Sequence, residues 1–417
     1  MIIRFVQKYR SGFFSNSTMP TPPYLHVAIP LMDELENLPA LVECLNQQSY
    51  RNFSVYMCVN QPESWWEDET ERQICANNAD SIVFLQSVEN LLITIIDRSS
   101  RGHGWPTKRH GVGYARKELF DTILKTATDN EIIVSLDGDT AFGKDYLASI
   151  AGQFAHNPHL SAIAVPYYHP LSGNATTDRS LLRYEIYMRH YLINMLQIGN
   201  PYAFTALGSA MALTVGAYKR CGGITPLQGG EDFYLMQKLC KTGKVSVYNK
   251  EIMYPLGRPS QRVPFGTGPA VMKTVAEQAV SYPFFATESF QKVRQTYNLF
   301  PALYEKDIPT PMTEFLCKQL KTDDVWQPLR KNFKTVPLFV KACTERVDGL
   351  RILQFLKSEH RQGSSNGNFA EFCTANDIPL PEGFSFESTD IRQLDEIRNA
   401  LFEKELELRK RKAPVCV

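Results

Sequence analysis

Four carboxylates in two short segments are the residues of this chain best suited to do chemistry. Asp137 and Asp139 follow the apolar run 132–136, and Glu231 and Asp232 follow two glycines. Carboxylate oxygens are the ligands that Mg²⁺ and Mn²⁺ prefer, and a carboxylate also serves as a general base. If the two segments meet, one cleft holds a divalent cation and a proton acceptor. Such a cleft suits the transfer of a group from a nucleotide diphosphate.

Each acid pair also has a plain structural interpretation. Asp-Gly turns with solvated carboxylates are common in loops. Acids at a helix start interact favourably with the helix dipole, by about 0.3–1 kcal/mol. The apolar strand before Asp137 and the glycines before Glu231 favour the functional interpretation, because glycines let a ligand approach the backbone.

The elements that must position these acids alternate in kind along the first part of the chain. The run 37–48 carries leucines at helical spacing. Apolar runs typical of strands lie at 27–30, 53–60, 81–85, 91–96, 132–136, 161–165 and 210–215. This alternation predicts an α/β sheet flanked by helices. Ligands of such sheets bind beyond the carboxyl ends of the strands, where Asn60 and Asp137 fall.

Helical periodicity replaces the strand signals past residue 276. The residues Ser388, Thr389 and Asp390 are a suitable helix start, before apolar residues at helical spacing and the basic run 409–412. We therefore expect an N-terminal extension at 1–23, an α/β domain at 24–275 and a mostly helical accessory domain at 276–417.

Composition limits the class of protein. The chain has 417 residues, of which 43% are hydrophobic and 11% aromatic, enough apolar surface for a core. A net charge of +1 gives no reason to expect a nucleic-acid partner, and nine cysteines without zinc spacing favour a reducing cytoplasm. We expect no membrane-spanning helix, and the charges within the apolar run 1–10 are not typical of a signal peptide. We expect a cytoplasmic protein, and leave open an oligomer and peripheral contact of the run 409–412 with the inner face of a membrane.

The order and spacing of these motifs resemble the family 2 glycosyltransferases with the GT-A fold, over residues 24–268. The shared features are the strands at 27–30 and 53–60, the motif at 111–117, the Asp-Gly-Asp (DXD) motif at 137–139, the glycine pair at 222–223 and the Gly-Glu-Asp run at 230–232. The resemblance implies a Rossmann-like mixed sheet, a nucleotide-sugar donor and Mn²⁺ or Mg²⁺ as cofactor.

The resemblance also implies roles for the acids. Asp139 would be the direct metal ligand, and Asp137 would contact the donor ribose or reach the metal through water. Asp232 would act as the general base that takes the proton of an acceptor hydroxyl. Glu231 would orient the acceptor or support the base.

Donor-binding residues are expected in further segments. Lys108 belongs to a basic, glycine-rich stretch, and Arg116 to the motif after it; a solvated surface is the alternative for both. Many relatives have a metal-binding histidine in the loop at 258–268, and this chain has none there, so the third metal ligand stays open. Relatives also often have an acid near the position of Asn60 that binds the nucleobase; its absence here leaves the nucleobase open. The complete expected set is Pro30, Asp33, Glu34, Asn60, Lys108, Arg116, Asp137, Arg258 and Arg262.

We therefore expect a metal-dependent hexosyltransferase of polysaccharide biosynthesis. It would move a sugar from a UDP-, GDP- or dTDP-sugar to a hydroxyl of a glycan or lipid-linked acceptor, with inversion. A retaining transferase of the same fold and a catalytically silent module that binds sugar nucleotides are the alternatives. The anomeric configuration of the product distinguishes a retaining from an inverting transferase. Hydrolysis of the donor in the presence of Mn²⁺ distinguishes an enzyme from a silent binding module.

Overall fold

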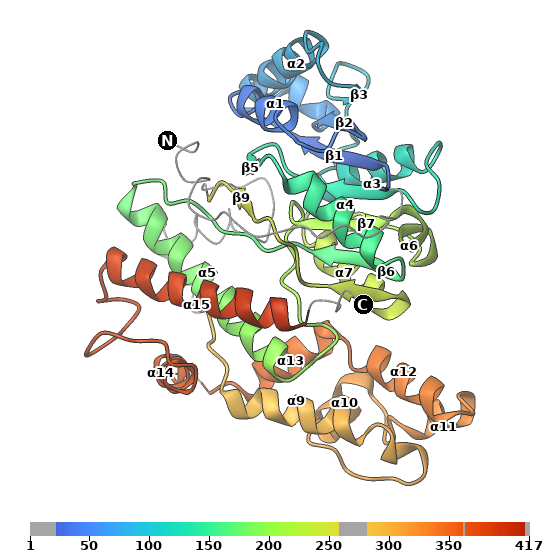
Figure 1. Ribbon diagram of the computed structural model, residues 1–417, viewed down its shortest axis with the longest axis vertical. Helices are drawn as coiled ribbons and strands as arrows, with labels where there is room; N and C mark the ends of the chain where they lie inside the picture. The colour runs from blue at the N-terminus through green and yellow to red at the C-terminus, as the bar shows by residue number, and fades with distance from the viewer. Residues whose placement is uncertain (1–21, 258–281, 362, 413–417) are drawn as a thin grey trace. The chain divides into compact units, whose positions relative to one another are not determined.

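The computed structural model describes residues 22–257, 282–361 and 363–412, drawn as a ribbon in Figure 1. These residues belong to two compact units. Among the described residues, the first unit contains 22–181, 205–257 and Lys412, and the second contains Leu182–Phe204, 282–361 and 363–411. Arg258 and Arg262 lie outside the described residues, as does most of the expected extension at 1–23.

The first unit alternates strands and helices. Its strands are β1 (Leu25–Leu31), β2 (Phe53–Asn60), β3 (Ile93–Arg98), β4 (Ile132–Ser135), β5 (Thr140–Phe142), β6 (Leu160–Ala164), β7 (Met211–Thr214), β8 (Lys244–Ser246) and β9 (Met253–Pro255). Its helices are α1 (Leu38–Asn46), the 3-10 helix η3 (Glu63–Glu67), α2 (Arg72–Gln86), α3 (Val112–Ile123), α4 (Tyr146–His156), α6 (Val215–Arg220) and α7 (Glu231–Thr242).

Seven strands form one mixed sheet in the order β3-β2-β1-β4-β7-β6-β8, and β5 pairs with β9 in a separate small sheet. The strands β3, β2, β1 and β4 run parallel, whereas β7 is antiparallel to both of its neighbours. The α/β fold class with a mixed sheet is thereby confirmed. Because the four parallel strands share a direction, the residues that follow β1, β2, β3 and β4 emerge at one edge.

Helices cover both faces of this sheet. In β1, Val27 and Ile29 belong to a core cluster with Leu41 of α1 and Ile150 of α4. Helix α3 contacts β1 and β2, and does not contribute to that cluster. Because both faces of β1 are covered, the strand is buried along its whole length, including the polar residue His26.

One expected strand is a helix. Residues 81–85 lie in the last turns of α2, which begins at Arg72. Buried residues recur along α2 at Cys75, Asn78, Ser81 and Leu85, a spacing of three to four residues that matches one face of a helix. The strand predicted at 81–85 is therefore wrong, because this apolar run is the end of a longer helical pattern whose earlier buried positions include polar residues.

The second unit is mostly helical. Helix α5 (Ala175–Gln197) begins in the first unit and contributes its residues from Leu182 onward to the second. The remaining elements are α9 (Thr287–Leu299), the 3-10 helix η4 (Ala302–Tyr304), α10 (Thr313–Leu320), α11 (Gln327–Asn332), α12 (Val336–Arg346), α13 (Gly349–Glu359), α14 (Ser365–Ala375) and α15 (Ile391–Arg411).

Two clusters stabilise the second unit. The ring of His190 is fully buried among phenylalanines, with ring centroids 4.6 Å from Phe372 and 5.3 Å from Phe284. Burial lowers the pKa of His190 to about 3, so its imidazole is neutral at pH 7. A second cluster joins α5 to α15 by ion pairs, because Glu405 pairs with Arg189 at 2.6 Å and with Arg409 at 2.7 Å.

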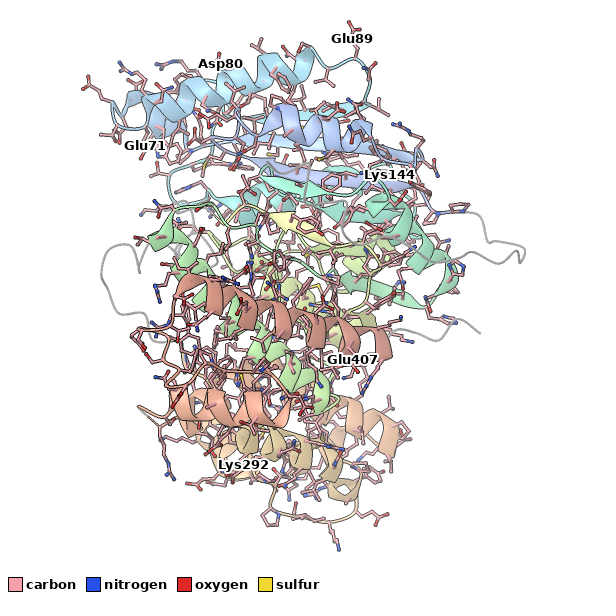
Figure 2. The ribbon with its side chains drawn as sticks, turned by 60° about the vertical axis from the view of Figure 1, so that its left-hand side comes forward. Glu71, Asp80, Glu89, Lys144, Lys292 and Glu407 are labelled. Atoms are coloured by element: carbon pink, nitrogen blue, oxygen red, sulfur yellow. The ribbon has the colours of Figure 1, made fainter. Side chains whose placement is uncertain are left out.

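Long charged side chains line the surface of both units. Figure 2 labels Asp80 on α2 and Glu407 on α15, and both are exposed. In the part of the chain that the structure describes, every helix is too short or too polar to cross a membrane.

Candidate functional site

The side chain of Arg116 joins the two acidic segments. It projects from α3, is 1% exposed, and donates from Nη2 to Asp137 Oδ1 at 2.6 Å. Its Nη1 donates to Glu231 Oε1, and its Nε to Ser135 Oγ at 3.0 Å. One guanidinium thus connects the end of β4 to the start of α7. The two acidic segments therefore meet, as expected from their sequence.

The sheet geometry explains why Arg116 reaches this position. Alternate residues of a strand point to opposite faces, and Val134 of β4 belongs to the core cluster with α1 and α4. Ser135 therefore points to the other face, where it meets Arg116 of α3. Asp137 follows just beyond the carboxyl end of β4, within reach of the same guanidinium.

Gly113 allows the start of α3 to pack closely against the segment that precedes Glu231. A Cβ atom added to Gly113 would lie 2.3 Å from the carbonyl oxygen of Leu227 and 3.2 Å from Cβ of Glu231. Only a residue without a side chain permits this approach. The glycine motif expected to contact the donor therefore packs against the acidic segment 231–232.

The turn at Gly138 is also close-packed. A Cβ atom at Gly138 would lie 2.7 Å from Cδ2 of Leu31 and 2.9 Å from Cγ of Glu34. The Asp-Gly-Asp turn therefore rests on the loop that follows β1. The Asp137 side chain is 34% exposed, and the backbone carbonyl of Asp139 accepts a hydrogen bond from Leu256 at 3.2 Å.

Electrostatics at this site are unbalanced. Asp137, Glu231 and Asp232 all interact with the single cation of Arg116. Burial raises the pKa of Glu231 to about 7, although Arg116 acts in the opposite direction. Burial likewise raises the pKa of Asp232, again opposed by Arg116. Three carboxylates share one guanidinium, so the ionised cluster has an excess of negative charge. This excess favours binding of a further cation or protonation of one carboxylate.

A divalent cation fits this chemistry. Asp137 and Asp139 supply hard oxygen donors, and the excess of negative charge is of the sign that Mg²⁺ or Mn²⁺ neutralises. Among residues 22–257, 282–361 and 363–412, no group of three or more His, Cys, Asp or Glu side chains is arranged as a metal site. Protein ligands for Mg²⁺ are commonly only one or two carboxylates, completed by water and phosphate oxygens.

The expected nucleotide-binding residues lie at the carboxyl ends of β1 and β2. Pro30 is a buried residue of β1, and Asp33 and Glu34 follow that strand. Asn60 is the last residue of β2, is 3% exposed, and donates from Nδ2 to the carbonyl of Leu31 at 2.8 Å. Through Glu34 and Gly138 this group is continuous with the acidic turn.

The structure does not bring every expected residue to the acids. Lys108 is exposed in the loop that precedes α3, and among the described residues no hydrogen bond or ion pair joins it to Asp137, Glu231 or Asp232. The guanidinium N–H groups of Arg116 are directed at protein acceptors. A direct contact of Arg116 with the nucleotide-sugar donor therefore stays a prediction.

Sequence reasoning missed Ser135 and Asn78. Ser135 is a polar residue inside an apolar strand, two positions before Asp137, and that interruption is a signal that the sequence does contain. Asn78 is fully buried on α2 and has no comparable signal, because the sequence around it was not assigned to a helix.

No protein-family model matches the chain, and no curated protein is similar to it in sequence. Solved structures match it weakly. A Pyrobaculum calidifontis mannosyltransferase, in complex with GDP-Man and Mn²⁺, is 14% identical, with 97% of this chain and 91% of that chain covered and a TM-score of 0.39. S. aureus TarS residues 1–349, in complex with UDP-GlcNAc, is 12% identical, with coverages of 78% and 91% and a TM-score of 0.38.

A third match is the Mycobacterium tuberculosis glucosyl-3-phosphoglycerate synthase in complex with UDP. It is 14% identical, with 61% of this chain and 80% of that chain covered and a TM-score of 0.31. Structural similarity this weak says nothing about function. A proposal about function therefore depends on the geometry of the site.

Proposed function

We propose that this protein is a glycosyltransferase of the GT-A superfamily that transfers a sugar from a nucleotide-diphosphate donor to an acceptor hydroxyl. The observation that carries the proposal is the bridge that Arg116 makes between Asp137 and Glu231. It places an Asp-Gly-Asp turn, a buried cation and a second acid pair at the carboxyl edge of one sheet, where α/β proteins bind nucleotides.

Each acid has a distinct part in the proposed reaction. Asp139, together with Asp137, would hold Mn²⁺ or Mg²⁺, which supplies charge neutralisation to the diphosphate of the donor. Asp232 accepts the proton of the acceptor hydroxyl as that oxygen bonds to the anomeric carbon and the bond to the diphosphate breaks. Attack from the face opposite the leaving group inverts the anomeric configuration.

The remaining residues hold these groups in place. Glu231 is 2% exposed and paired with Arg116, so its role is to orient the start of α7 and thereby Asp232. The raised pKa of Asp232 fits a general base, because a more basic carboxylate accepts a proton more readily. The donor is a UDP-, GDP- or dTDP-sugar, and the acceptor is a glycan or a lipid-linked hydroxyl compound.

Two substitutions separate binding from chemistry. Asp139→Ala should abolish Mn²⁺-dependent binding of nucleotide, read as the loss of a thermal shift across the three donor classes. Asp232→Asn keeps the size of the side chain and removes the proton acceptor, so it should retain the shift and lose transfer by at least about a hundredfold. Asp80→Asn is the control, because Asp80 is exposed on α2. Transfer at the wild-type rate by Asp232→Asn contradicts the assignment of the base.

A further inference from the structure

Helix α2 presents a fully buried amide to the loop that follows β1. The side chain of Asn78 is 0% exposed, on the face of α2 that also buries Cys75 and Leu85. A buried amide is costly unless its donors and acceptor are satisfied. Its hydrogen bonds therefore indicate what this residue does.

Asn78 connects the ends of β1 and β2. Its Oδ1 accepts from the backbone nitrogen of Asp33 at 2.9 Å, and its Nδ2 donates to Oε1 of Gln61 at 2.7 Å. The adjacent residue of α2, Asn77, accepts from the backbone nitrogen of Leu35 at 3.2 Å. Two consecutive amides of one helix thus hold the loop 33–35 by its backbone.

The backbone of Asp33 needs such support. Its φ is +57°, in the left-handed region that residues other than glycine adopt at a cost of about 1–3 kcal/mol. Such a conformation persists where surrounding contacts fix it, and the hydrogen bond from Asp33 to Asn78 is one of these contacts.

The position of this loop is transmitted to the Asp-Gly-Asp turn. Glu34 follows Asp33 directly, is 6% exposed, and packs against Gly138 so closely that a Cβ at Gly138 would lie 2.9 Å from Cγ of Glu34. A shift of the loop 33–35 therefore moves the surface on which Asp137 and Asp139 rest.

From these contacts we infer that Asn78 is a positioning residue for the nucleotide part of the donor, acting through the loop 33–35 without touching the ligand. The inference rests on the proposed function for the identity of that ligand. The path runs from α2 through Asp33 and Glu34 to Gly138, and it lies wholly within the first unit.

The test compares four variants by affinity for UDP, GDP and dTDP with Mn²⁺, measured by calorimetry, and by kcat and KM for transfer. Asn78→Leu has similar volume and makes no hydrogen bond, so nucleotide affinity should fall about tenfold, with KM rising more than kcat falls. Asn78→Asp retains an acceptor for the Asp33 N–H but loses the donor to Gln61, so its affinity should lie between those of Asn78→Leu and the wild type. Asn77→Ala, which removes only the bond to Leu35, should weaken binding by less than Asn78→Leu.

Ser81→Ala is the matched control. Ser81 is 1% exposed on the same face of α2, but its hydroxyl donates to the carbonyl of Asn77 within the helix. Its removal deletes a buried hydrogen bond of α2 but no bond to the loop 33–35, so Ser81→Ala should not weaken nucleotide binding. Equal loss of affinity in Ser81→Ala and Asn78→Leu overturns the inference, because the loss would then not depend on the bond to Asp33.

Amide hydrogen exchange provides a readout that needs no nucleotide. Asn78→Leu should speed exchange at Asp33, and Ser81→Ala should not. If the wild-type protein binds none of UDP, GDP and dTDP, the proposed function fails, while faster exchange at Asp33 in Asn78→Leu still supports control of the loop by Asn78. Unchanged exchange at Asp33 in Asn78→Leu overturns that control. Should Asn78→Leu not fold, exchange at Asp33 is measured in Asn78→Ala, which also removes the acceptor of the Asp33 N–H.

Discussion

Arg116 is the cation on which the acids of the candidate site depend. Substitution by Ala removes the charge that pairs with Asp137 and Glu231 and leaves Ser135 without its donor. Removing one partner of a buried ion pair typically costs about 3–5 kcal/mol. We therefore expect Arg116→Ala to lower the free energy of unfolding by that amount, measured by urea denaturation, and to abolish transfer.

A surface ion pair is the control for this substitution. Lys219 pairs with Asp129 at 2.7 Å, and both side chains are well exposed. Exposed pairs contribute about 0–1 kcal/mol, so Lys219→Ala should have a small effect. Similar losses of stability in the two variants would show that the burial of Arg116 contributes nothing to its importance.

At the scale of single residues, the sequence predicted the acids and Arg116 as site residues, but not that Arg116 joins the acids. Asp137 and Glu231 were recognisable because each follows an apolar strand or a glycine pair. Their common contact was not, because it depends on Arg116 occupying the face of α3 that meets Ser135. Asn78 was missed for a related reason, because its side chain accepts a hydrogen bond from the backbone of Asp33, in a loop distant in sequence.

At the scale of elements, the contact between α3 and the segment before α7 depends on Gly113. Alanine there would place a Cβ 2.3 Å from the carbonyl oxygen of Leu227, which is backbone and cannot move aside as a side-chain end can. We expect Gly113→Ala to cost about 1–3 kcal/mol of stability. It should also reduce transfer, because the displaced segment carries Glu231 and Asp232.

Gly152 supplies the matched substitution. It lies inside α4, and a Cβ there would have no atom within 4 Å. Alanine is favoured over glycine in a helix interior by about 1 kcal/mol, so Gly152→Ala should raise stability and leave transfer unchanged. Thermal denaturation of both variants checks the pair. A stable, active Gly113→Ala variant would exclude close packing as the reason for the glycine.

The same scale shows what periodicity predicts well. The run 53–60 is β2, and the helix expected at 37–48 is α1, because both patterns are complete within their own segments. The strand expected at 81–85 was wrong because its local apolar run is the end of a longer helical pattern. The pairing of the antiparallel β7 between β4 and β6 depends on tertiary contacts that no local pattern contains.

At the scale of the whole molecule, residues far apart in the chain form one unit. The second unit combines Leu182–Phe204 with the described residues between 282 and 411, and the sequence showed helical periodicity only in the later segment. Ion pairs join the two parts, because Arg398 reaches Glu185 at 3.1 Å and Glu405 reaches Arg189 at 2.6 Å. Helical periodicity predicts that α15 has a buried face. It does not predict that this face carries charges, or that their partners come from α5.

Two glutamates of α15 test this pairing. Glu405 is 2% exposed and pairs with Arg189 and Arg409, whereas Glu407 is exposed and pairs only on the surface with Arg411. Glu405→Ala should lower the free energy of unfolding by about 3–5 kcal/mol, because two buried guanidiniums lose their shared carboxylate. Glu407→Ala should cost less than about 1 kcal/mol. Urea denaturation decides, and equal effects of the two substitutions would mean that burial of the charges does not govern the assembly of α5 with α15.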